Sequence, residues 1–308
     1  MSRRLTTALT TLLSRRGFCA AGGQALALGA LPTVAGAQTA HPTASEILSS
    51  LARLAETELV AGRLDAPVRG MALLADPTLA TLRAAVAAGA SLILSPETPF
   101  YARPMDAQAA NGPFAAMAAS TVAALHDSPA YKAKQAFIAD HDLTICRLTP
   151  RTADHDLSAD AVAARLGWTG HRVAGEHSIY APPKVTVGAL VHLARTRLGA
   201  SGGLRFIGDP ARRLGSILIV PGTAEVVSTT RALRYADALL TGDVREWEVV
   251  TYVHDSIDAG LPKAMVATGR ILSEQPFLEQ CTLAVRQAFP RVPLHAPVQP
   301  DPFWRIQA

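Results

Sequence analysis

The sequence has few aromatic residues and no surplus charge beyond its first 37 residues. Aromatic side chains make up 5% of the 308 residues, too few for the stacking platforms on which proteins bind single-stranded nucleic acid. Four of the 29 basic residues lie within residues 1–37, which contain no acid, so the rest of the chain carries 25 basic against 25 acidic residues. That part is neutral, and its overall charge gives no reason to expect nucleic acid as a partner.

Common active-site motifs and paired cysteines are also absent. The chain has no P-loop, no GxSxG, HExxH or CxxC motif, and no GxGxxG followed by an acid. The usual sequence evidence for nucleotide binding, serine hydrolysis and zinc peptidase chemistry is therefore missing. Only Cys146 and Cys281 follow residue 37, and both lie in apolar runs. We expect two buried thiols rather than a disulfide.

The first 37 residues are typical of an export signal. They contain a twin-arginine pair, a weakly apolar run and a small-residue cleavage triplet, in that order: Ser14-Arg15-Arg16-Gly17-Phe18, Cys19 to Val34, and Ala35-Gly36-Ala37. The apolar run of about 16 residues is shorter than the roughly 20 that span a bilayer. We predict that residues 1–37 are a cleaved twin-arginine signal and that the mature protein is periplasmic, without a stable membrane anchor.

The remaining sequence predicts an α/β fold. With 49% apolar and 18% charged residues, the chain can bury a core. A first helix is expected from Ser45 as N-cap through Leu59. Apolar runs typical of covered strands then alternate with helical patterns. Strands are expected at 68–74, 91–94, 143–148, 216–220, 238–240, 264–267 and 292–295, and helices at about 77–88, 113–126, 129–139, 158–166, 185–198, 246–258 and 273–289, with a further helix from Pro221-Gly222 to about Tyr235. We predict two related α/β lobes with mixed sheets, at 38–168 and 204–308, joined by 169–203.

Four acids follow the predicted strands, where ligands bind in α/β sheets. These are Glu97, Asp243, Glu248 and Glu274. Carboxylates that converge can bind a metal or transfer protons. The alternative is that Asp243 and Glu274 lie in the first turns of helices, where an acid complements the helix dipole. Spacing alone favours this alternative.

Six motifs resemble one known family. They are Glu97 with Phe100-Tyr101, Lys134 to Ile138 before a strand ending at Arg147, Leu166-Gly167-Trp168, Thr241 to Glu248, Gly269 to Glu274, and Pro302-Phe303-Trp304. In this order they resemble the NIF-three-like family, also called the dinuclear metal centre hexameric or type 2 GTP cyclohydrolase-like family, and most closely an exported branch with twin-arginine signals. The resemblance implies two similar α/β lobes, a toroidal homohexamer, and two divalent metals held by His and carboxylates.

The residues at the family's metal-ligand positions differ in this chain. The His of the first motif is Pro96 here, and the neighbouring acid is retained as Glu97. The His-rich segment after the third strand reads Arg147 to Ala153, without a histidine, and the His of the Gly269 to Glu274 motif is Arg270, with the acid retained. Zinc and similar ions prefer imidazole together with carboxylate. We therefore expect no tightly bound metal pair.

Two interpretations follow from these differences. In the first, Arg270, with Arg151, replaces the metal charge and pairs with Glu97 and Glu274. The protein is then an exported, non-catalytic or small-anion-binding member of the family with a degenerate metal site and no cofactor, and its pocket residues are Glu97, Tyr101, Arg147, Arg151, Asp243, Glu248, Arg270 and Glu274. In the second, it is a metal-dependent hydrolase with one Mg²⁺ or Mn²⁺ on a carboxylate site of Glu97, Asp154 and Glu274, with Asp243 as a fourth ligand.

Overall fold

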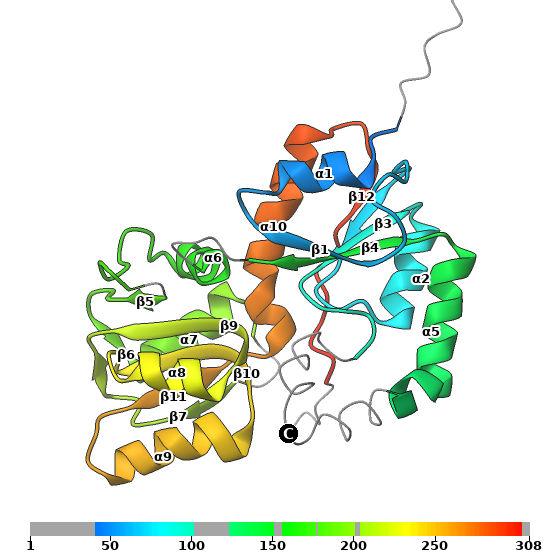
Figure 1. Ribbon diagram of the computed structural model, residues 1–308. Helices are drawn as coiled ribbons and strands as arrows, with labels where there is room; N and C mark the ends of the chain where they lie inside the picture. The colour runs from blue at the N-terminus through cyan, green and yellow to red at the C-terminus, as the bar shows by residue number, and fades with distance from the viewer. Residues whose placement is uncertain (1–40, 102–122, 151–155, 177, 201–203, 304–308) are drawn as a thin grey trace, which may run out of the picture. The chain divides into compact units, whose positions relative to one another are not determined.

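Two five-stranded mixed sheets form from the apolar runs (Figure 1). The computed structural model describes residues 41–101, 123–150, 156–176, 178–200 and 204–303. The first sheet has the order β1-β4-β3-β2-β12, with β1 at Glu56–Ala61, β2 at Met71–Leu73, β3 at Leu92–Ser95, β4 at Thr144–Thr149 and β12 at Leu294–His295. Its neighbouring strands are parallel except β1, which is antiparallel to β4.

Helices cover both faces of the first sheet. One face packs against α1 (Ala44–Ser50) and the part of α10 (Arg270–Ala288) from Phe277 onward, and its core includes Ile47, Leu92 and Phe277. The other face packs against α2 (Leu79–Ala87) and α5 (Pro129–Asp140), which lie side by side in Figure 1. The central strands β2 and β3 are buried along their whole length because both faces are covered.

The second sheet has the order β5-β9-β10-β11-β7. Its central strands β9 (Ile217–Ala224), β10 (Ala238–Val244) and β11 (Ala264–Ala267) are parallel, and the edge strands β5 (Ile179–Tyr180) and β7 (Arg205–Ile207) are antiparallel to them. A separate pair joins β6 (Val185–Thr186) and β8 (Arg213–Leu214).

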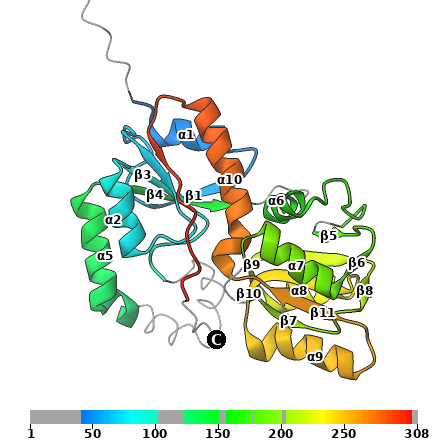
Figure 2. The ribbon, with the colours of Figure 1, turned by 180° about the vertical axis from the view of Figure 1, so that it is seen from behind.

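Helices also cover both faces of the second sheet. Helices α6 (Leu157–Leu166) and α7 (Val187–Arg197) pack on the face nearer the viewer in Figure 2. Helix α8 (Val226–Leu233), the π-helical turn η1 (Glu246–Val250) and α9 (Thr251–Asp258) cover the other face, which is turned to the viewer in Figure 1. The predicted α/β class with mixed sheets is therefore confirmed.

The N-terminal part of the prediction is wrong in one element. Leu59 belongs to strand β1 and not to the first helix, which ends at Ser50 and is capped by Thr43 rather than Ser45. The Thr43 hydroxyl accepts from the backbone N–H of Glu46, and the Glu46 carboxylate accepts from the Thr43 N–H, which is a capping box. Strand β1 is an edge strand with an almost fully exposed pattern, so no alternation of apolar residues marks it.

Strands β9 and β10 continue past the residues where the sequence predicts their ends. Val220 pairs with Thr241, and Thr223 pairs with Asp243, so Pro221 and Gly222 together lie opposite Gly242. This is a β-bulge, where a proline without an N–H is tolerated. Asp243 consequently lies inside β10 and not in a loop or a helical first turn, which corrects both expectations for this residue.

The packing does not follow the predicted lobe boundaries. Helix α6 and Trp168, assigned from sequence to the first lobe, lie in a core of the second sheet. Strand β12 returns from the C-terminal end of the chain to the edge of the first sheet. Helix α10 begins at Arg270, three residues before the predicted start. The expected signal at 1–37 lies outside the described residues, as does most of the expected helix at 113–126.

Both thiols beyond residue 37 are buried and free, in agreement with the sequence-based expectation. Burial raises the pKa of Cys146 to about 11 and that of Cys281 to about 12, so both stay protonated near neutral pH. Among the helices in the described residues, none is long and apolar enough to cross a membrane.

Helix α10 provides a test of the core of the first sheet. Phe277 is 1% exposed in this core, whereas Leu283 on the same helix is 60% exposed. We expect Phe277→Ala to lower the free energy of unfolding by about 3–5 kcal/mol because it leaves a cavity. The matched control Leu283→Ala should change it by less than about 0.5 kcal/mol. Urea unfolding followed by circular dichroism measures both, and equal effects would contradict the described packing.

Candidate functional site

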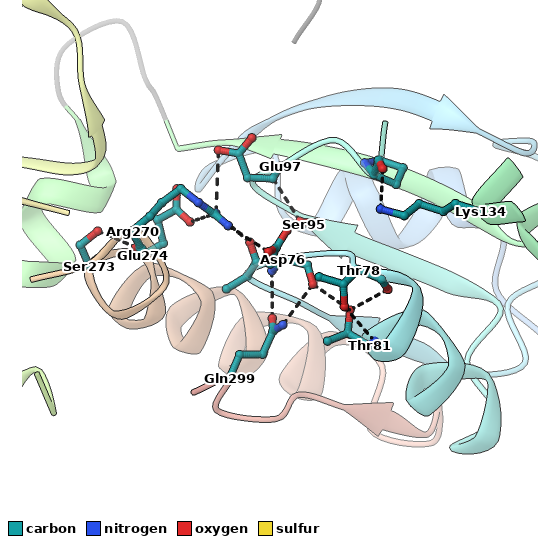
Figure 3. A network of polar contacts seen from close by, with 12 residues as sticks. Asp76, Thr78, Thr81, Ser95, Glu97, Lys134, Arg270, Ser273, Glu274 and Gln299 are labelled. Carbon is teal, nitrogen blue, oxygen red and sulfur yellow. Dashed lines mark hydrogen bonds and ion pairs between the residues drawn. The ribbon is translucent and has the colours of Figure 1, made fainter. Parts of the chain in front are cut away.

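Charged side chains meet where strands of both sheets end. Asp76 follows β2, Glu97 follows β3, and Arg270 is the first residue of α10, shortly after β11. The carboxyl ends of parallel strands are the usual place for ligands in α/β folds. We call Arg270 with its three acidic neighbours, Asp76, Glu97 and Glu274, the Arg270 cluster (Figure 3).

The guanidinium of Arg270 contacts all three carboxylates. Its Nη1 donates to Glu274 Oε2 at 2.9 Å and lies 3.9 Å from Glu97 Oε1. Its Nη2 lies 3.4 Å from Asp76 Oδ2. Nη1 also donates to the backbone carbonyl of Ala75 at 3.1 Å. One guanidinium therefore joins the loop after β2, the loop after β3 and the first turns of α10.

The Arg270 cluster is largely withdrawn from water. The Arg270 side chain is 21% exposed, and those of Glu97 and Glu274 are 11% exposed. Screening is weaker there than at the surface, so each contact is stronger than an exposed ion pair. Removing the cation alone would leave partly buried carboxylates close together, which is the costly way to break such a group.

Backbone contacts hold the two acidic loops in place. The Ser95 hydroxyl accepts from the N–H of Glu97 at 3.1 Å, at the start of its loop. The side-chain amide of Gln299 accepts from the Asp76 N–H at 2.9 Å and donates to the Asp76 carbonyl at 3.0 Å. The C-terminal segment after β12 thereby fixes the backbone of Asp76 while its carboxylate faces Arg270 (Figure 3).

Glycine at two positions permits the close approach of α10 to the second sheet. A Cβ at Gly242 would lie about 2.3 Å from both the Gly222 carbonyl oxygen and the Ser273 hydroxyl, and 2.9 Å from Arg270 Cα. Gly222 has φ +73°, and its N–H donates to the Ser273 hydroxyl at 2.9 Å. Only glycine fits at position 242, and this close packing determines how near Arg270 lies to the ends of the strands.

Other predicted site residues lie away from the Arg270 cluster in separate contacts. Arg147 pairs with Glu58 at 3.2 Å, Asp243 with Arg205 at 3.7 Å, and Glu248 with Arg245 at 2.8 Å. The Tyr101 ring lies 4.3 Å from the ammonium of Lys134. The structure thus brings together Arg270, Glu97 and Glu274 from the predicted set. Arg151 and Asp154 lie outside the described residues.

Sequence reasoning missed Asp76, Lys134 and Gln299. Asp76 has a local signal in the sequence, because it follows an apolar strand and directly precedes Pro77. Glu97 likewise follows a strand and lies two residues before a proline. Lys134 lies in one of the six family motifs, but helical spacing does not show that its ammonium is buried. Gln299 had no local signal, since its partner Asp76 is 223 positions away in the chain.

The donor groups of the Arg270 cluster do not suit a divalent metal pair. A metal site needs several lone pairs directed at one shared centre, and zinc-type ions favour imidazole among them. Here the guanidinium N–H groups occupy the space that the carboxylates face. Throughout the described part of the chain, no group of three or more His, Cys, Asp or Glu residues is arranged to hold a metal ion.

Comparisons relate the chain to known proteins. The model of the Duf34/NIF3 (NGG1p interacting factor 3) family matches residues 149–302. Hypothetical protein SA1388 of Staphylococcus aureus is similar in structure, with a TM-score of 0.63 and 14% identity, covering 86% of this chain and 100% of its own. A Bacillus cereus protein related to NIF3 gives a TM-score of 0.60 and 15% identity, covering 87% and 100%.

Reduced HcgD from Methanocaldococcus jannaschii is also similar, with a TM-score of 0.58 and 13% identity, covering 83% of this chain and 97% of its own. No curated protein matches the chain. At these identities the structural likeness concerns the fold alone.

The burial of the Arg270 cluster predicts its contribution to stability. We expect Arg270→Met to lower the free energy of unfolding by about 1–3 kcal/mol, because Glu274 loses a hydrogen-bond donor and all three carboxylates lose their shared cation. The matched control Arg205→Met removes an arginine that is 53% exposed and pairs with Asp243 and Glu246, and it should change the free energy by less than about 1 kcal/mol. Urea titration at pH 7 compares the two, and an Arg270→Met protein as stable as wild type would show that the contacts are not maintained.

Proposed function

The chain belongs to the Duf34/NIF3 family, and from this premise we propose that it is an exported, non-catalytic member in which Arg270 takes the role of the metal charge. The observation that carries the proposal is the single guanidinium shared by Glu274, Asp76 and Glu97. Arg270 stands where the family resemblance places a metal-binding histidine. A guanidinium cannot bind a metal because it has five N–H donors and no lone pair at neutral pH.

The charges around Arg270 favour a structural role for its guanidinium over anion binding. A small anion that reached Arg270 would compete with three carboxylates that already contact the same nitrogens. Displacing them would leave partly buried negative charges without this partner. We therefore propose that the Arg270 cluster holds the strand-end loops together and that anion binding is not its main task.

The alternative function, a hydrolase with a single metal ion, has less support. It needs Glu97, Glu274, Asp154 and Asp243 to converge, whereas the Asp243 side chain pairs with Arg205 and Glu274 pairs with Arg270. Both pairs would have to separate before these acids shared one cation. Metal content distinguishes the two functions.

We expect the protein purified without chelator to contain less than about 0.2 equivalents of Zn, Fe, Mn or Mg per chain, since the family's histidine positions hold other residues. Arg270→His restores an imidazole beside Glu97, Glu274 and Asp76, and this variant should bind zinc with near 1:1 stoichiometry in calorimetric titration. Elemental analysis measures the metal content of the wild-type protein, and calorimetric titration measures the zinc stoichiometry of Arg270→His.

The matched control for the metal experiment is Arg205→His, which places a histidine beside the exposed Asp243 and Glu246. It should bind at least tenfold more weakly than Arg270→His, because exposed ligands are not held in position. A wild-type protein with one or two metals per chain would overturn the proposal in favour of the hydrolase.

We also propose export by the twin-arginine route and homo-oligomerisation, with a hexamer as the expected assembly. With Arg15→Lys combined with Arg16→Lys, the uncleaved precursor should remain in the cytoplasm, because the transport machinery recognises the arginine pair. Cell fractionation with immunoblotting measures the distribution. Arg3→Lys with Arg4→Lys is the control, because it makes the same two charge-conserving substitutions but leaves the pair at Arg15 and Arg16 intact. Equal export of all forms would contradict the route.

A further inference from the structure

Lys134 is a buried amine beside the Arg270 cluster that the ion pairs do not use. The chain has only four lysines, Lys132, Lys134, Lys184 and Lys263. Lys134 lies on α5, is 5% exposed, and extends its side chain toward the loop that carries Glu97 (Figure 3). A lysine is rarely buried to this extent unless it is paired.

The ammonium of Lys134 has few partners for its three donors. Its Nζ donates to the Pro99 carbonyl at 2.7 Å and lies 4.3 Å from the centre of the Tyr101 ring. Within the described residues no carboxylate forms an ion pair with it. By contrast, Lys132 pairs with Asp127 at 3.0 Å in an exposed position, and Lys263 donates to two carbonyl oxygens.

This environment makes the Lys134 amine easier to deprotonate than that of an exposed lysine. Burial lowers its pKa, and the charge of Asp76 opposes the shift only in part. A neutral amine has a lone pair on nitrogen, which makes it the nucleophilic form of lysine. Among side chains near the Arg270 cluster, Lys134 is therefore suited to attack an electrophilic carbon.

We propose that Lys134 is a covalent binding site for small aldehydes or ketones, which it holds as an imine. The amine nitrogen attacks the carbonyl carbon to form a C–N bond, and the carbinolamine then loses water as its C–O bond breaks. The two N–H hydrogens and the carbonyl oxygen leave as that water, and no oxidant or reductant is needed. The reaction is reversible, so it suits a protein that captures carbonyl compounds without a metal ion.

Tyr101 controls access to the amine. Tyr101 is 55% exposed, and its ring lies against the ammonium of Lys134. The residue has φ +67°, a conformation that non-glycine residues seldom adopt and that the surrounding contacts must maintain. Movement of this ring opens a path to Nζ, so Tyr101→Ala should speed capture by about threefold or more.

Reductive trapping tests the proposal on the wild-type protein. The full mature chain is incubated with acetaldehyde and cyanoborohydride at pH 7, where the reagent supplies hydride and converts any imine into a stable ethylamine. Peptide mass spectrometry then reports each of the four lysines separately. We expect Lys134 to be modified about tenfold faster than the exposed Lys132 and Lys184, because burial lowers the pKa of Lys134 and so enlarges the neutral fraction of its amine.

Two variants separate nucleophilicity from charge and burial. Lys134→Arg keeps a cation beside Pro99 but removes the nucleophile, and it should lose the fast adduct. Lys263→Arg is the matched control, because burial also lowers the pKa of Lys263 while two carbonyls hold its ammonium; the fast adduct should persist. Modification of Lys134 at the rate of Lys132, or none even in Tyr101→Ala, would overturn the proposal. The comparison within the wild type does not depend on any variant folding.

Discussion

The sharing of one guanidinium among three carboxylates is the interaction on which the strand-end region depends. Arg270 contacts a loop after β2, a loop after β3 and the second turn of its own helix. Each loop brings an acid into a partly desolvated position that would be unfavourable without a cation. Glycine at 242 and the hydroxyl of Ser273 set the position of α10, and Gln299 sets that of Asp76. The arrangement is therefore determined by packing as well as by charge.

A cation that is part of the chain differs physically from a bound metal ion. Arg270 cannot dissociate, be removed by a chelator or change its occupancy with the supply of metal, because its charge belongs to a side chain of the protein. It also offers no open coordination position, so it cannot polarise a substrate or activate water as zinc does. Under the proposed function, the charge at this position is permanent and the site has no Lewis-acid chemistry. The buried amine of Lys134 provides a different kind of reactivity nearby.

Sequence patterns predicted the buried strands and most helices because covered sheets require continuous apolar runs. They failed at β1, whose exposed edge position leaves no apolar alternation, and at the β9–β10 bulge, where Pro221 and Gly222 resemble a turn. The Arg270–Glu274 pair was expected from the family motif, in which Arg270 occupies the position of a histidine. The contributions of Gln299 and Lys134 depend on long-range packing, which one sequence does not encode in any local pattern.

The position of β12 determines when the first sheet can be completed. This N-terminal sheet takes an edge strand from residues 294–295, and one of its cores needs Phe277, Cys281 and Val285 of α10. These contacts join residues far apart in the sequence, so the fold has a high contact order. The ribosome must therefore synthesise nearly the whole chain before the core of the first sheet can be completed. Until synthesis is nearly finished, the apolar strands of the first sheet lack their partners.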